Sequence, residues 1–308
     1  MKRLVPFAAA LLASSAPDLA LGQTLQFANL HVAQTVTGGV ISTAVAAAPG
    51  STAGFTIGAA NAGAYDLNFG NASDTDSGVV IASVSQNGRD NSSVGEAYGL
   101  FYATTTTSKP DQTGDAARYQ LGVRRAAQGH KANMDVSFAY FPFSSFLAGH
   151  ATNSVNNTAI DAVVASPGIA LGAQFKNTAT NGVYTLDLTG LGGSSATGVL
   201  LVSGGKDEDN FALSGPNADG TFSIVCHDNG SNGAGGEADP VVFAYLPTSM
   251  VGTNNLVAIG RVNSDASTDV AAGTFTVTKG GTGQWYLQIP GHSPATGTLL
   301  FSHERGVT

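Results

Sequence analysis

The sequence predicts an all-β protein built from tandem antiparallel β-sandwiches, with a jelly-roll or immunoglobulin-like layout. Three observations carry this prediction. A strand with the pattern Phe-Ala-Tyr recurs after about 105 residues. Short stretches of alternating apolar and polar residues, separated by turns rich in Gly and Asn, fill the chain. No helical apolar period competes with them after the first 22 residues.

Residues 1–22 are predicted to be a secretory signal peptide. Lys2 and Arg3 form its charged start, an apolar run follows, and Ala20-Leu21-Gly22 supplies small residues for cleavage before Gln23. A membrane anchor is the weaker alternative, because two prolines and an aspartate interrupt the segment and no later stretch could span a bilayer. We therefore expect a secreted protein at the outside or surface of a bacterial cell, with the periplasm as the alternative.

The repeat is defined by two matching strands. Asp135–Pro142 returns as Asp239–Pro247, with Phe138 and Phe243 placed 105 residues apart, and Phe27-Ala28-Asn29 is a shorter echo near the start. A period of this length is typical of tandem domains. Phased from these strands, the units are residues 23–134, 135–239 and an incomplete 240–308. An incomplete sandwich would leave an unpaired edge, so either the physical boundaries are offset from this phase, or a partner chain completes the third unit, or the unit was clipped from a longer protein.

Within each unit the predicted strands follow one order. The first is an alternating strand whose first, third and fifth residues face inward. Its copies are Tyr65–Phe69, Tyr184–Leu188 and Trp285–Ile289. A glycine, a polar loop and an apolar run follow, the closest copies of the run being 196–203 and 295–302. Residues 119–124 and 222–227 then lead into the Phe-Ala-Tyr strands, and 169–173 after one such strand resembles 256–261 after the other. The pattern resembles secreted bacterial β-sandwich arrays, a resemblance that implies fold and not function.

Composition limits the partners. The formal net charge is −8 and only 11% of residues are charged, so the chain cannot neutralise a phosphate backbone and no nucleic-acid partner is expected. The single cysteine, Cys226, cannot form an internal disulfide, and its place in an alternating strand predicts a small buried side chain.

Acidic turns are the candidate metal ligands. Asp207, Glu208 and Asp209 place carboxylates on one short loop, as calcium requires, and 71–78 and 217–220 are similar turns. None has the spacing of an EF-hand, and Asp and Asn are also ordinary turn residues that bond their own backbone. Calcium is the one cofactor that the sequence suggests.

Two loops bear on catalysis. Gly291-His292-Ser293-Pro294-Ala295 resembles a degraded nucleophile elbow, but an apolar strand follows where an elbow needs a helix, so we interpret it as a turn. His227 and Asp228, with Glu237 and Asp239 nearby in sequence, form the other candidate acid-base set.

The sequence therefore favours a non-catalytic structural, surface or adhesion role, with polysaccharide or a cell-surface or matrix component as partner, and with self-association. A carbohydrate-binding module assisted by calcium is one alternative, for which Tyr98, Tyr102, Tyr140, Tyr245 and Tyr286 are candidate outward platforms. A secreted polysaccharide or ester hydrolase is the other.

Overall fold

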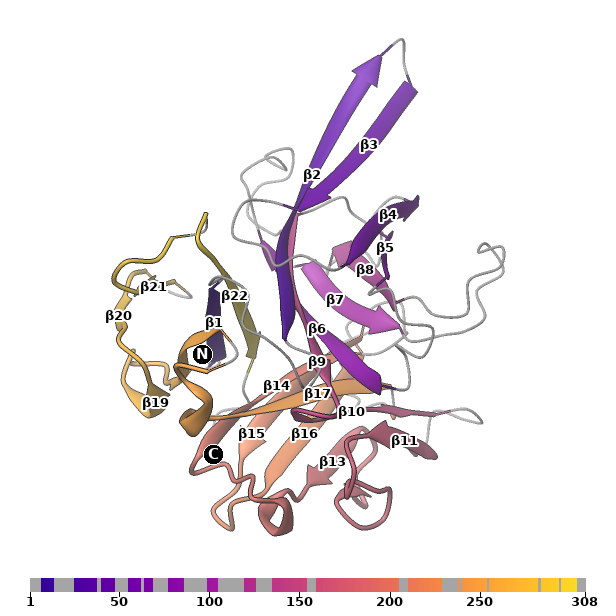
Figure 1. Ribbon diagram of the computed structural model, residues 1–308. Coiled ribbons are helices and arrows are strands. Elements are labelled where there is room, and N and C mark those ends of the chain that lie inside the picture. Colours follow the sequence, from indigo (N-terminus) through magenta and orange to yellow (C-terminus); the bar gives the residue numbers. More distant parts are fainter. Residues whose placement is uncertain are drawn as a thin grey trace.

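In the residues that it describes, the computed structural model consists of β-strands and two short 3-10 helices, which confirms the all-β prediction (Figure 1). Leu188 and Pro247 directly precede the 3-10 helices, η1 (Thr189–Leu191) and η2 (Thr248–Met250). The structure describes residues 7–13, 25–37, 40–47, 55–61, 64–68, 77–85, 99–104, 119–125, 135–153, 159–204, 210–228, 238, 240–253, 255–281, 284–293 and 295–303.

The structure has three groups of four antiparallel strands; two of them share one order of pairing, and the third differs in that its third strand comes first in the chain. The first group is β3 (Val40–Ala47), β2 (Gln26–Thr37), β9 (Asp135–Pro142) and β6 (Gly78–Ser85). The middle group is β11 (Ala162–Ala165), β10 (Leu147–Thr152), β17 (Val241–Pro247) and β14 (Gly198–Gly204). The third group is β19 (Thr268–Ala272), β18 (Leu256–Val262), β1 (Phe7–Ala13) and β22 (Gly297–His303).

The remaining strands are antiparallel within each set. The set β4 (Thr56–Asn61), β5 (Ala64–Asn68), β8 (Tyr119–Arg125) and β7 (Gly99–Thr104) continues the middle group, so that these eight strands form one sheet in the order β11-β10-β17-β14-β7-β8-β5-β4. A separate four-stranded sheet holds β12 (Phe175–Asn177), β13 (Val183–Leu186), β16 (Phe222–Asp228) and β15 (Asn210–Pro216). Within the described residues, β20 (Thr276–Lys279) and β21 (Trp285–Gln288) form a two-stranded sheet. A single parallel bridge between Gly204 and Tyr102 joins β14 to β7.

The register of the Phe-Ala-Tyr strands is the same in two groups. Gly78 stands opposite Pro142 in the first group, and Gly198 stands opposite Pro247 in the middle group. Both Phe-Ala-Tyr strands pair with strands that precede them in the chain, so each completes a group instead of opening the next one. The strand that follows β9 in the chain is β10, and β10 is therefore the counterpart of β18. Residues 169–173, which were predicted to match 256–261, instead form turns with one isolated bridge.

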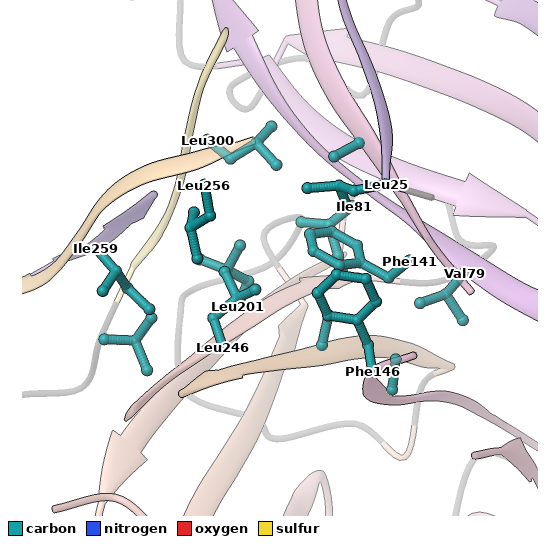
Figure 2. Close-up of a cluster of buried hydrophobic side chains, with 14 of the residues drawn as sticks. Leu25, Val79, Ile81, Phe141, Phe146, Leu201, Leu246, Leu256, Ile259 and Leu300 are labelled. Atoms are coloured by element: carbon teal, nitrogen blue, oxygen red, sulfur yellow. The ribbon is translucent and has the colours of Figure 1, made fainter. Parts of the chain in front are cut away.

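One apolar core joins the three groups. It takes side chains from β2, β6 and β9, from β10, β14 and β17, and from β18, β19 and β22. Figure 2 shows Phe141 and Phe146 beside Leu201 and Leu246, and these two aromatic rings meet edge to face at 5.2 Å. Burial of this many apolar side chains is the main stabilising contribution. The three groups are thus packed on each other, not strung along a linker.

A second core lies on the other side of the middle group. It is built from the opposite face of β14 and β17 and from the inward positions of β12, β13 and β16, where Tyr184, Leu186 and Leu188 are buried. Alternation sends Leu201 to the shared core and Leu200 to this one, so β14 is buried on both faces. The sequence of β14 is almost continuously apolar because both faces of the strand are covered.

The apolar run of the predicted leader is strand β1. It pairs antiparallel with β18 on one side and with β22 on the other, with Ala10 opposite both Ile259 and Leu300. It holds in the third group the position that β9 and β17 hold in theirs (Figure 1). No helix among the described residues has the length and apolar character needed to cross a bilayer.

Candidate functional site

The predicted calcium ligands Asp207, Glu208 and Asp209 lie outside the described residues, as do residues 71–76. The third acidic turn, 217–220, is described, and its Asp219 carboxylate accepts hydrogen bonds from the Thr221 backbone N–H at 3.0 Å and from its hydroxyl at 2.7 Å. Across the described part of the chain, no three His, Cys, Asp or Glu side chains gather as a metal site would require. Asp219 is occupied as a turn residue.

The same turn occurs three times. Asp187, Asp219 and Asp265 each precede by two positions a Thr or Ser whose hydroxyl and backbone N–H both bond the carboxylate. The bond from the hydroxyl is the larger cause, and the bond from the N–H the second, of a pKa that lies below the ordinary 3.8 in all three carboxyls. Both bonds stabilise the charged form. The turns thus favour the folded chain most when the carboxylates are ionised.

The Ser293 loop is a turn that leads into a strand, as predicted. The Thr296 backbone N–H donates to the Ser293 carbonyl at 2.9 Å, and β22 begins at the next residue. The matching loop has the same bond, from Thr197 N–H to the Ser194 carbonyl at 3.0 Å. This geometry belongs to a strand connection, since an elbow would place the serine before a helix.

The other acid-base candidate is only partly described. His227 and Asp228 end strand β16, opposite Phe211 and Asn210, while Glu237 and Asp239 fall outside the described residues. Cys226 is buried on the same strand, as its alternation predicted.

A buried tyrosine seated on a glycine is a feature that sequence reasoning missed. The Tyr245 hydroxyl accepts from the Ser194 N–H at 3.0 Å and lies 3.1 Å from the Thr197 hydroxyl oxygen. A Cβ on Gly198 would stand 2.6 Å from the Tyr245 ring. We call Ser194, Thr197 and Gly198 the tyrosine cradle. The glycine that recurs before each apolar run was the only feature of the sequence that pointed to this cradle.

The first group has the same arrangement. Tyr140, on β9, lies with its hydroxyl oxygen 3.0 Å from the Ser77 hydroxyl, and a Cβ on Gly78 would stand 2.6 Å from its ring. Both tyrosines are buried, so their prediction as outward carbohydrate platforms is wrong. The side chains of Tyr98 and Tyr102 are not described, and Tyr286 is 64% exposed.

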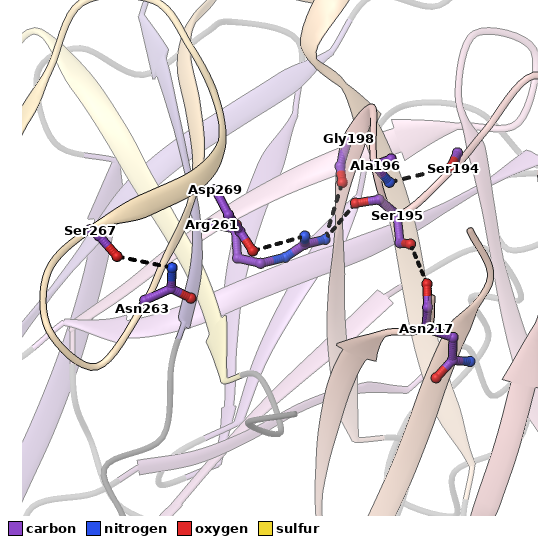
Figure 3. Close-up of polar contacts among 9 residues, drawn as sticks. All are labelled: Ser194, Ser195, Ala196, Gly198, Asn217, Arg261, Asn263, Ser267 and Asp269. Carbon is purple, nitrogen blue, oxygen red and sulfur yellow. Dashed lines mark hydrogen bonds and ion pairs between the residues drawn. The ribbon is translucent and has the colours of Figure 1, made fainter. Parts of the chain in front are cut away.

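Arg261 connects the third group to the turn of the middle group (Figure 3). Its side chain is only 4% exposed, and one guanidinium nitrogen donates to the carbonyls of Ser195 at 3.0 Å and Gly198 at 3.4 Å. Its other nitrogen lies 3.6 Å from the carboxylate of the half-exposed Asp269. A buried charge is tolerated here because carbonyls and a carboxylate surround it.

The third group is joined to the first by side chains that reach strand β22. Asn29 donates to the Gly297 carbonyl at 2.9 Å. The Ser83 hydroxyl donates to the Phe301 carbonyl at 2.9 Å and accepts from the Phe301 N–H at 2.8 Å. These contacts satisfy backbone groups on the edge of β22 that does not face β1, and a satisfied edge does not template further pairing.

The third group also has an open apolar cleft between its two sheets. Trp285 and Leu287 are half-buried, whereas Tyr184 and Leu186 at the matching positions of the middle segment are buried. The two strands differ in their neighbours: β13 lies between β12 and β16 in its sheet, whereas in the described part of the chain β21 pairs only with β20. The cleft is lined by Ala258, Ile259, Gly260, Val262, Phe275, Leu287, Ile289 and Leu299.

Comparison with protein-family models, with curated proteins and with solved structures gives no match for this chain. The arrangement of strands, cradles and the open cleft is therefore the basis for assigning a role.

Proposed function

We propose that this is an exported, non-catalytic structural or adhesion protein, built from three copies of one two-sheet sandwich with the third copy unfinished. Support for the copying comes from the common strand order of the first and middle groups, from the third group apart from β1, and from the matching orders β4-β5-β8-β7 and β12-β13-β16-β15. The pairing supports copies that run from β2 to β9, from β10 to β17 and from β18 to β22, with β9 and β17 as the last strands of the first two copies. The units are thus offset by about one strand from 23–134, 135–239 and 240–308.

The shared core is the observation that carries a structural role. Apolar side chains from all three copies meet in it. The side chains of Arg261 and Asn29 each donate to a backbone carbonyl of another copy. Such packing makes a rigid body from three small units, and rigid arrays that present loops and edges are suited to holding partners. The carboxylates of Asp187, Asp219 and Asp265 are bonded within turns, which suits a scaffold.

Export is tested by expressing the tagged chain in a bacterium and separating the cell fractions. We expect the protein outside the cytoplasm, with an N-terminus at Gln23 by mass spectrometry, and cleavage by trypsin added to intact cells if it is held at the surface. The matched control replaces Lys2 and Arg3 with Asp, which removes the charged start of the leader and should retain the chain inside. A chain that stays cytoplasmic with its leader attached would contradict the proposal.

Carbohydrate binding is a second candidate, favoured by the exposure of Tyr286. Its ring is 64% exposed on a two-stranded sheet, next to the uncharged Gln284 and Gln288, and a flat aromatic face is a common support for sugar rings. Retention on insoluble polysaccharide should then be lost in Tyr286→Ala and kept in Tyr184→Phe. Comparing retention with and without a chelator tests the contribution of calcium through Asp207, Glu208 and Asp209.

A further inference from the structure

In the third group, β1 holds the position that a Phe-Ala-Tyr strand holds in the other two groups. In the other two groups the residue two positions after the glycine faces a tyrosine: Val80 faces Tyr140, and Leu200 faces Tyr245. In the third group Leu299 is the residue two positions after Gly297, and Leu11 of the leader faces it. The leader therefore holds the position of a Phe-Ala-Tyr strand without supplying its tyrosine.

The third group nevertheless keeps the residues of the tyrosine cradle. Ser293, Thr296 and Gly297 stand where Ser194, Thr197 and Gly198 stand in the middle group. Their turn is closed by the same backbone bond, but the Ser293 N–H donates to the Thr296 hydroxyl at 2.8 Å. In the middle group the matching N–H of Ser194 bonds the tyrosine hydroxyl. A cradle is present, and the strand that would fill it is not in the group.

The number of strands makes the same point. Residues 23–308 contain two Phe-Ala-Tyr strands, β9 and β17, and three places for such a strand. Both strands are paired on each side within their own groups. Exchange of strands between copies of the chain cannot change this deficit, because each copy brings three places and two strands. Among the described residues of 23–308, no further Phe-Ala-Tyr strand is left to occupy the third place.

We propose that the space between β18 and β22 is a strand-acceptor site. Its occupant, once the leader has been removed, is an uncharged extended segment of a partner polypeptide that places a tyrosine opposite Leu299. The walls favour such a segment, since β22 carries no Asp, Glu, Lys or Arg and the one charge on β18, Arg261, is bonded to the middle group. Backbone hydrogen bonds from both walls supply affinity and the cradle supplies selectivity. This inference rests on the proposed export, because cleavage is what vacates the site.

The test uses a labelled peptide with the sequence of residues 240–248, extended by lysines outside the pairing region. We expect saturable binding to residues 23–308 by fluorescence anisotropy. Binding should be about tenfold weaker or worse when the tyrosine of the peptide is replaced by alanine, a loss that corresponds to about 1.4 kcal/mol. The chain that keeps residues 1–22 should bind about tenfold more weakly, because the leader occupies the site. Gly297→Val should abolish binding, with Gly190→Ala as the matched control.

A second measurement does not require the processed chain to fold. In the chain with its leader, Leu11→Tyr should raise the melting temperature by filling the cradle, whereas Leu12→Tyr, which pairs with Thr298 and is one residue out of the register of the cradle tyrosines, should lower it or leave it unchanged. The proposal is overturned if a folded 23–308 takes up no peptide, if the alanine peptide binds equally well, or if Leu11→Tyr is no more stable than Leu12→Tyr. None of these results bears on export, which the fractionation tests separately.

Discussion

At the residue scale, the buried hydroxyl of Tyr245 and carboxylates near the surface hold turns of this protein in place. Tyr245 is 1% exposed, yet its hydroxyl is bonded to Ser194 and Thr197, so the aromatic ring fills the sandwich while its polar end closes a turn. Gly198 is required beneath that ring because a side chain would collide with it. Small polar bonds of this kind decide how strands enter the sheet.

Removing the Tyr245 hydroxyl should therefore destabilise the fold. In Tyr245→Phe the Ser194 N–H loses its partner, and we expect a loss of about 1–3 kcal/mol in the free energy of unfolding. Urea denaturation followed by circular dichroism measures it. Tyr286→Phe, at an exposed site, is the control and should change little. Equal stability of the two variants would mean that the Tyr245 hydroxyl is not needed.

Adding a methyl group beneath the same ring should also be costly. In Gly198→Ala the new Cβ would stand 2.6 Å from the Tyr245 ring and 2.5 Å from the Leu246 carbonyl oxygen, and overpacking of this kind costs about 1–3 kcal/mol. Gly190→Ala is the control, because no atom lies within 4 Å of its Cβ position. Thermal unfolding of the two variants should separate them by several degrees, and identical melting curves would refute the tight contact.

Acid should weaken the aspartate turns in a defined direction. The pKa of Asp219 is lowered in the folded state by the Thr221 hydroxyl, so its contribution to stability is full above the ordinary 3.8 and is lost as pH falls through the lowered value. Asp219→Asn should be less stable than the parent at neutral pH and should lose less on acidification from about pH 5 to pH 2. Denaturant midpoints measured across this range check it; parallel profiles would contradict it.

At the element scale, strands are joined across groups by single side chains. Arg261→Met keeps the apolar stem but leaves the carbonyls of Ser195 and Gly198 without their donor, and we expect a loss of about 1.5–3 kcal/mol. Asp269→Asn removes only a half-exposed ion-pair partner and should cost less than about 1 kcal/mol. Urea midpoints of the two variants measure the difference. A larger effect at Asp269 would show that the ion pair, and not the carbonyl bonds, holds β18.

At the scale of the whole molecule, the shared core should make the three groups unfold together. Trp285 is the only tryptophan and lies on β21, so its fluorescence reports on the third group. Leu201→Ala, in the middle group, should lower stability by about 2–5 kcal/mol and should shift the fluorescence and circular dichroism transitions equally. A fluorescence transition that stays at its wild-type midpoint would show that the third group folds alone.

The sequence by itself determined the strands, because alternation and turn residues are local properties of the chain. It placed inward positions such as Tyr184 and Leu186, the turn at Ser293 and the burial of Cys226 without knowledge of any neighbour. Only the tertiary structure decided which strand completes which group, why Tyr140 and Tyr245 face inward, and that β1 lies between β18 and β22. Those features depend on pairing between segments far apart in the chain, and a hydrogen-bonded edge leaves no periodic pattern in the residues that form it.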